Sequence, residues 1–317
     1  MAVIGLVTDS IKMPNLALMK LSAYHKEKGD IVDWYNPLFF SDYNKVYYSK
    51  IFTFTKHYPY YINNVEEGGT GFNINKKLPY EINVMQPDYS IYPDIDYAVG
   101  FLTRGCIRKC KWCVVPEKEG YIKSYRTVEQ IARTDSNKIV FLDNNVLASD
   151  FGIGEIEKLS RSNYYIDFNQ GLDVRLVTDE IADLLVKIKW IKYIRFSCDT
   201  TLMLPKIIEV AELLRSKGYK KDIFVYVLGI EPEDTLYRLN ELKKHKITPF
   251  MQPYRDLSNF AIINPELKKM ARWCNRKWLF KSCSYEEYND KKRKYPLKYE
   301  DTIKYFLELE GEKDAVI

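Results

Sequence analysis

The stretch Thr103–Pro116, TRGCIRKCKWCVVP, is the most informative part of this chain. It sets Cys106, Cys110 and Cys113 in a C-x3-C-x2-C array directly after residues 97–102, an apolar run that predicts a buried strand. Iron–sulfur clusters that only carry electrons are held by four cysteines, so a local set of three leaves one iron without a protein ligand. An open metal position is where a substrate or cofactor binds. The array therefore predicts a catalytic cluster site.

A zinc site and three unrelated cysteines are the alternatives to this interpretation. A structural zinc ion takes four ligands, commonly from a second pair of cysteines or histidines. The histidines of the chain, His25, His57 and His245, all lie far from the array in the sequence. The pattern therefore favours an iron–sulfur cluster over zinc.

The residues around the array resemble those of the radical S-adenosylmethionine (radical SAM) superfamily. Arg104-Gly105-Cys106 matches the start of the cluster loop in one group of its members, Cys113-Val114-Val115-Pro116 matches the end, and Trp112 is similar to the aromatic residue found there. Members of that group carry an amino-terminal cobalamin-binding-like domain. The resemblance implies a 4Fe-4S cluster on the three cysteines, with S-adenosyl-L-methionine on the fourth iron.

The resemblance also implies a reaction. A reduced 4Fe-4S cluster cleaves S-adenosylmethionine to methionine and a 5'-deoxyadenosyl radical, which removes a hydrogen atom from an unactivated carbon of the substrate. An electron donor such as flavodoxin or ferredoxin would supply the cluster. Methyl transfer is one reaction of this class, and the sequence identifies neither the substrate nor the subclass. The alternative is a non-catalytic nucleic-acid-binding module that a metal or a cluster stabilises.

The order of elements after the array predicts an α/β fold. The expected strands are residues 97–102, 139–143, 165–169, 193–197, 223–228 and 247–251, and the expected helices are residues 153–160, 179–188, 204–216 and 233–244. This alternation is typical of a parallel sheet with helices between its strands. The family resemblance implies that residues 97–255 form a partial (β/α)6 radical SAM barrel.

Residues 1–96 predict a separate, Rossmann-like α/β layer. Val3–Val7 and Ile31–Tyr35 are expected strands, and Asn15–Lys28 between them is an expected amphipathic helix. A cobalamin-binding domain would carry a histidine ligand after its first strand, but Thr8–Pro14 contains none. The segment is also short for such a domain. Bound cobalamin is therefore the less favoured interpretation.

Polar residues follow the expected strands, where ligands gather in parallel α/β folds. By position, the resemblance assigns Asp143 and Asn144 to the ammonium of the cofactor's methionine moiety and Arg175 to its carboxylate. A turn rich in Asx residues is the alternative for the first pair. A surface ion pair with Asp173 or Asp179 is the alternative for Arg175.

The later strands add candidates for the nucleoside part of the cofactor. Ser197 and Asp199 are expected to meet the ribose hydroxyls, and Gly229 lies in a segment whose backbone would line the adenine. A glycine at a strand end is also common in bulges and turns.

Three cysteines lie outside the array, namely Cys198, Cys274 and Cys283. None precedes Cys106, which argues against a methylthiotransferase with a second cluster in its amino-terminal domain. Cys198 follows an expected strand and is the candidate catalytic thiol. Packing in the core, or an auxiliary cluster shared by all three, are the alternatives.

Residues 256–317 predict a basic helical extension. Its lysines and arginines, Lys291, Lys292, Arg293 and Lys294 among them, alternate with aromatic residues, a pattern that suits a nucleic acid backbone and stacked bases. Solvated lysines on packed helices are the alternative. The net charge of +5 over 317 residues says little by itself about partners.

Composition predicts a cytoplasmic enzyme with a full core. The chain is 46% hydrophobic, yet it has no apolar run of membrane-spanning length and no signal peptide at its start. Six cysteines are too few for a disulfide scaffold in a chain of this length, and an oxygen-sensitive cluster needs a reducing compartment.

Overall fold

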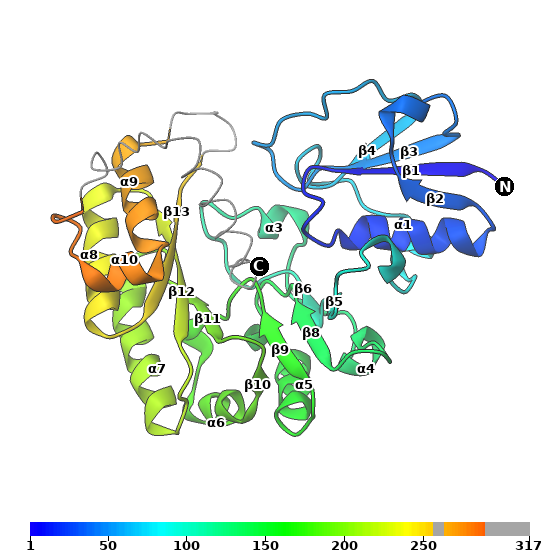
Figure 1. The fold of residues 1–317 in the computed structure, drawn as a ribbon. Coiled ribbons are helices and arrows are strands. Elements are labelled where there is room, and N and C mark those ends of the chain that lie inside the picture. The colour runs from blue at the N-terminus through cyan, green and yellow to red at the C-terminus, as the bar shows by residue number, and fades with distance from the viewer. Residues whose placement is uncertain (256–262, 289–317) are drawn as a thin grey trace, which may run out of the picture.

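The computed structural model describes residues 1–255 and 263–288, in which parallel strands alternate with helices (Figure 1). The strands are β1 (Val3–Thr8), β2 (Ile31–Trp34), β3 (Lys45–Ser49), β4 (Val65–Gly68), β5 (Ala98–Gly100), β6 (Thr103–Arg104), β7 (Lys123–Ser124), β8 (Lys138–Phe141), β9 (Tyr165–Phe168), β10 (Lys189–Trp190), β11 (Ile194–Ser197), β12 (Ile223–Gly229) and β13 (Thr248–Pro253). The α-helices are α1 (Leu16–Glu27), α2 (Tyr80–Asn83), α3 (Val115–Lys118), α4 (Val128–Ile131), α5 (Asp150–Ser160), α6 (Asp179–Lys187), α7 (Leu204–Ser216), α8 (Pro232–Lys244), α9 (Pro265–Cys274) and α10 (Lys277–Ser282). The predicted α/β class is confirmed.

The amino-terminal sheet has the order β2-β1-β3-β4 and is parallel throughout. Its central strand β1 is buried on both faces, as strands of parallel sheets usually are. Ile4 and Leu6 pack with Leu18 of α1, whereas Val7 belongs to a second cluster with Tyr48. The strands at residues 3–8 and 31–34 and the helix between them agree with the sequence prediction, while β3 and β4 were not predicted.

The strands predicted after residue 96 are all present and form two parallel sheets. One has the order β10-β9-β8-β5 and the other the order β11-β12-β13. A single parallel bridge between Leu172 and Phe196 joins them, and the Leu172 N–H donates to the Arg195 carbonyl at 2.8 Å. Figure 1 shows α5, α6, α7 and α8 along the outer side of these strands.

A buried ion pair reinforces the junction of the two core sheets. Arg195 of β11 donates from Nε and Nη2 to the carboxylate of Asp167 of β9, at 2.7 and 2.6 Å. The two side chains are only 6% and 9% exposed. A third guanidinium nitrogen, Nη1, donates to the Tyr226 hydroxyl at 3.1 Å. The paired charges therefore tie β9 to both β11 and β12.

The amino-terminal sheet packs against the β5 side of the core. Val99 of β5 shares a buried cluster with Ile4 and Leu18. Lys20 of α1 is also buried there, and its ammonium donates to the Asn83 carbonyl at 2.6 Å and the Tyr125 hydroxyl at 3.1 Å. Burial, helped by nearby arginine charges, lowers the pKa of Lys20 to about 7. The limits 1–96, 97–255 and 256–317 stay predictions as domain boundaries.

The carboxy-terminal helices α9 and α10 pack on the β13 end of the core. Their aromatic residues are mostly interior, because Trp273, Phe280, Tyr285 and Tyr288 are 7% exposed or less, and Trp278 alone among the five is 63% exposed. The aromatic residues of this segment therefore serve mainly as core. Lys291, Lys292, Arg293 and Lys294 lie outside the described residues. Among the residues that are described, none of the helices has both the length and the apolar character that crossing a membrane requires.

Replacing Asp167 with alanine tests the ion pair at the sheet junction. Asp167→Ala leaves the buried Arg195 guanidinium without its counter-charge, so we expect the free energy of unfolding to fall by about 3–5 kcal/mol. Urea denaturation followed by circular dichroism measures this change. The double variant Asp167→Ala/Arg195→Met is the control and should recover much of the loss. A single variant as stable as the wild type would contradict the assignment.

Candidate functional site

The three cysteines of the array lie on a loop that is closed at its two ends. We call residues 104–119 the cysteine loop. Arg104 donates to the Glu119 carboxylate through Nε at 2.7 Å and through Nη2. Arg104 belongs to β6, which pairs antiparallel with β7. The Arg104 guanidinium also stacks on the Phe101 ring, 3.9 Å from its centre. Both ends of the cysteine loop are thus held where β5 ends.

Gly105 explains the Arg-Gly-Cys start of the loop. Its φ is +88°, a left-handed conformation that side chains other than glycine rarely adopt. A Cβ atom here would collide with the carbonyl oxygen of Tyr121 and lie 2.7 Å from that of Gly120. The Cys106 N–H donates to the same Gly120 carbonyl at 3.2 Å. Only glycine lets the two ends of the loop come this close.

The three thiols of the loop are free and are electrostatic neighbours of one another. Cys106 and Cys110 are partly buried and Cys113 is exposed. Although Cys113 is exposed as a residue, desolvation of its sulfur raises its pKa, and the thiols of Cys110 and Cys106 add to the rise. No set of three histidine, cysteine or acidic side chains in the described ranges could hold a single metal ion. In a 4Fe-4S cluster each thiolate binds a different iron, so the three sulfurs need not converge on one point.

Asp143 holds the chain at the point where it enters the cysteine loop. Its carboxylate accepts the Leu102 N–H at 3.0 Å, the Thr103 N–H at 2.6 Å and the Thr103 hydroxyl at 2.8 Å. Burial raises the pKa of Asp143 to about 6, while these hydrogen bonds oppose the rise. The carboxylate predicted to bind a cofactor ammonium is therefore occupied by the backbone. Asn144 beside it is partly exposed.

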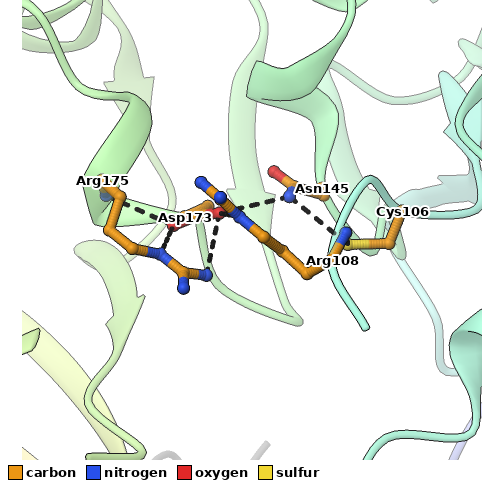
Figure 2. A network of polar contacts seen from close by, with 5 residues as sticks. All are labelled: Cys106, Arg108, Asn145, Asp173 and Arg175. Atoms are coloured by element: carbon orange, nitrogen blue, oxygen red, sulfur yellow. Dashed lines mark hydrogen bonds and ion pairs between the residues drawn. The ribbon is translucent and has the colours of Figure 1, made fainter. Parts of the chain in front are cut away.

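Asn145, which the sequence did not single out, lies at the centre of a polar network (Figure 2). Its side chain is almost fully buried, and Nδ2 donates to the Cys106 Sγ at 3.4 Å and to the Asp173 Oδ2 at 3.3 Å. Oδ1 of the same amide is buried, and none of the described residues gives it a hydrogen bond. The signal available in the sequence was the run of three polar residues, Asp143 to Asn145, at the carboxyl end of a predicted strand, where ligands gather in parallel α/β folds.

Asp173 gathers the positive charge of the site. It accepts Arg108 Nε at 2.9 Å, and Arg175 Nε and Nη2 at 2.7 and 3.0 Å (Figure 2). Burial alone would raise the pKa of Asp173, but the two guanidinium groups hold it below its ordinary value. The alternative stated for Arg175, an ion pair with Asp173, is thus present, although this pair borders the cysteine loop. Asp173, with smaller contributions from Cys110 and Asp199, raises the pKa of Arg175.

The residues after β11 divide between the site and the core. Asp199 is desolvated, which raises its pKa, while Arg238, Arg175 and a hydrogen bond from Trp112 of the cysteine loop lower it. Cys198 points into the core and is fully buried, and burial raises the pKa of its thiol to about 12. A reactive cysteine needs exposure and a lowered pKa. The structure therefore favours packing over catalysis for Cys198.

The remaining predicted residues have plain structural surroundings. Ser197 ends β11 and pairs with Tyr226 of β12. A Cβ atom at Gly229 would meet the terminal methyl group of Met251, the flexible end of a side chain that can turn aside, so packing between β12 and β13 does not by itself require a glycine here. Cys274 is buried and Cys283 is partly buried, and neither joins a set that could hold a metal ion in the described residues. Nothing in these contacts tests a role for Ser197 or Gly229 toward a cofactor.

Comparison with known proteins places this chain in no family. No family model and no curated protein matches it. One solved structure with some likeness is that of Streptococcus suis SuiB bound to the precursor peptide SuiA, which is 14% identical, with a TM-score of 0.38. The match covers 53% of this chain and 42% of SuiB. Likeness at this level carries no argument, so function has to be inferred from the site.

Alanine at Gly105 tests the closure of the cysteine loop. Gly105→Ala combines an unfavourable φ with a collision, whereas Gly120→Ala has a similar φ of +76° but open space around the new Cβ. Each substitution should cost about 1–2 kcal/mol for its backbone conformation. Only the first should open the loop, and trypsin should then cut faster after Arg108, Lys109 and Lys111. Mass spectrometry of timed digests compares the two variants, and equal cleavage rates would argue against the collision.

The raised pKa of Asp143 predicts a pH dependence of stability. The pKa of this carboxyl is near 3.9 in the unfolded chain and about 6 in the folded protein. At a pH between these two values the carboxyl is protonated more often in the folded protein, so the free energy of unfolding rises as the pH falls. We expect the free-energy difference between wild type and Asp143→Asn to grow by about 1 kcal/mol from pH 7 to pH 5. Urea unfolding at both pH values measures it. A difference that stays constant or shrinks would contradict the assignment.

Proposed function

We propose that this chain is a radical SAM enzyme that binds a 4Fe-4S cluster through Cys106, Cys110 and Cys113. One observation carries the proposal: a single closed loop after β5 carries all three free thiols, beside the carboxyl ends of parallel strands. Loops at that edge are where α/β folds place their ligands. Three ligands leave one iron open for S-adenosylmethionine.

The residues beside the cysteine loop suit this pair of cofactors. Desolvation raises the pKa of the Cys110 thiol, and the positive charge of Arg175 opposes that rise. The same charge would stabilise the negative charge of a cluster. The buried Oδ1 of Asn145 lacks a donor, and an N–H or ammonium group of a bound cofactor is the kind of group that would satisfy it. The donor set and the orphaned acceptor thus fit a cluster with a polar organic ligand.

Several side chains are placed to hold S-adenosylmethionine. Arg175 uses two of the five N–H donors of a guanidinium on Asp173, which leaves others for the carboxylate of the methionine moiety. Asp199, fixed by Trp112 of the cysteine loop, suits the ribose hydroxyls. We keep Asn144, Ser197 and Gly229 as proposed contacts on position alone. When bound, the cofactors supply reductive carbon–sulfur cleavage and hydrogen abstraction from an unactivated carbon.

The proposed architecture is a partial (β/α)6 barrel. It would use β5, β8, β9, β11, β12 and β13, which occur in this order along the chain with helices after most of them. The bridge at Leu172 and the ion pair of Arg195 with Asp167 would join its two halves. Lys109 and Lys111 are exposed on the cysteine loop and would attract an acidic electron donor such as flavodoxin or ferredoxin. Reaction subclass and substrate follow from none of these contacts.

Anaerobic reconstitution tests the proposal. Protein incubated with iron and sulfide should take up about four of each, and replacing Cys106, Cys110 or Cys113 with alanine should reduce uptake strongly, because each thiolate holds one iron. Iron and sulfide analysis with electron paramagnetic resonance (EPR) measures this. Cys198→Ala and Cys274→Ala are matched controls, since both thiols are buried away from the loop. Stoichiometric zinc without iron uptake would refute the proposal.

A further inference from the structure

The Asn145 side chain links the Cys106 sulfur to a buried position that is open to a ligand. Its Nδ2 donates to the sulfur at 3.4 Å, whereas its Oδ1 is buried and accepts no hydrogen bond from residues 1–255 and 263–288. We propose that Asn145 is a positioning residue that fixes the Cys106 thiolate and raises the reduction potential of the cluster. This inference rests on the proposed function, because it needs a cluster on Cys106.

The orientation of the Asn145 amide follows from its neighbours. Nδ2 faces two acceptors, the Cys106 sulfur and the Asp173 carboxylate. If the amide were turned over, its oxygen would face both of them and repel them. Asp173 cannot move away, because Arg108 and Arg175 hold it from two sides (Figure 2). With a side chain this buried, the amide has one favourable orientation.

A hydrogen bond to a cluster-bound sulfur favours the reduced cluster. Reduction adds one negative charge that spreads onto the sulfur ligands, and an N–H donor stabilises it. Cys106 has two such donors, the backbone N–H of Arg108 at 3.3 Å and the amide of Asn145. Substitution can remove only the second. The side chain of Asn145 is therefore the donor through which a substitution can change the reduction potential of the cluster.

Through its Oδ1 atom, Asn145 would make the hydrogen bond to the Cys106 sulfur depend on a ligand bound beside the cluster. Hydrogen bonds in a chain polarise one another, so a donor placed on Oδ1 strengthens the N–H···S bond at the other end of the amide. A ligand bound beside the cluster with an N–H group toward Oδ1 would then raise the potential further. Electron entry would become easier when the ligand is present.

Two substitutions separate the donor of Asn145 from its shape. Asn145→Leu removes the N–H donor and leaves a side chain of similar size. Asn145→Asp replaces the donor with an acceptor. In full-length, reconstituted protein with unchanged iron content, we expect the ratio of reduced to oxidised cluster at a fixed potential to fall about tenfold in both, equivalent to about 59 mV for one electron. Anaerobic titration followed by EPR measures the ratio. Asn163→Leu, at an exposed asparagine that precedes β9 and accepts the Lys189 ammonium, is the control and should leave the ratio unchanged.

The outcomes distinguish this inference from the proposed function. A wild-type protein that takes up no cluster overturns both. A complete cluster with an unchanged potential in Asn145→Leu overturns the role of Asn145 alone. If that variant assembles no cluster, wild-type protein labelled with 15N in its asparagine amides decides by pulsed EPR. Coupling of the reduced cluster to an amide nitrogen supports the inference, and its absence overturns it.

Discussion

The position of the three thiols depends on the closure of the cysteine loop at both ends. The left-handed Gly105 allows its two ends to approach, and the Arg104–Glu119 pair holds them together. Asp143 adds a third restraint from the neighbouring strand, since it accepts the two N–H groups before the loop. None of these groups has to touch a ligand. They determine where the sulfurs are, and every chemical property proposed for the site depends on that position.

The elements of the core could be predicted because local pattern and long-range packing agree there. Leu204–Ser216, for example, is a helix with the bounds expected from its apolar periodicity, and its buried residues include Ile207, Val210 and Leu214. The two-residue strands β6, β7 and β10 are too short to leave a periodic signal. The division of the core strands into two sheets was also missed, since it depends on one bridge at Leu172.

The three cysteines of the candidate site could be identified from the sequence, whereas the surroundings of these cysteines could be predicted less well. Spacing along the chain identifies Cys106, Cys110 and Cys113, because all three lie on one loop. The tasks of Asp143 and Asn145 depend instead on which of three adjacent polar side chains turns toward Leu102 or Cys106. Strand position placed Cys198 near the site, yet its side chain points into the core. The sequence placed these residues at the correct strand ends, but it did not show in which direction each side chain points.

The buried cluster that Val99 shares with Ile4 and Leu18 makes the two parts of the chain inseparable. Strand β5 leads into the cysteine loop, and the buried neighbours of its Val99 all come from residues 4–92. A gene fusion or deletion that cut the chain at residue 96 would strip this strand of its cover and leave the Lys20 contacts unmade. We therefore expect the amino-terminal layer and the core to fold together and not as two independent units.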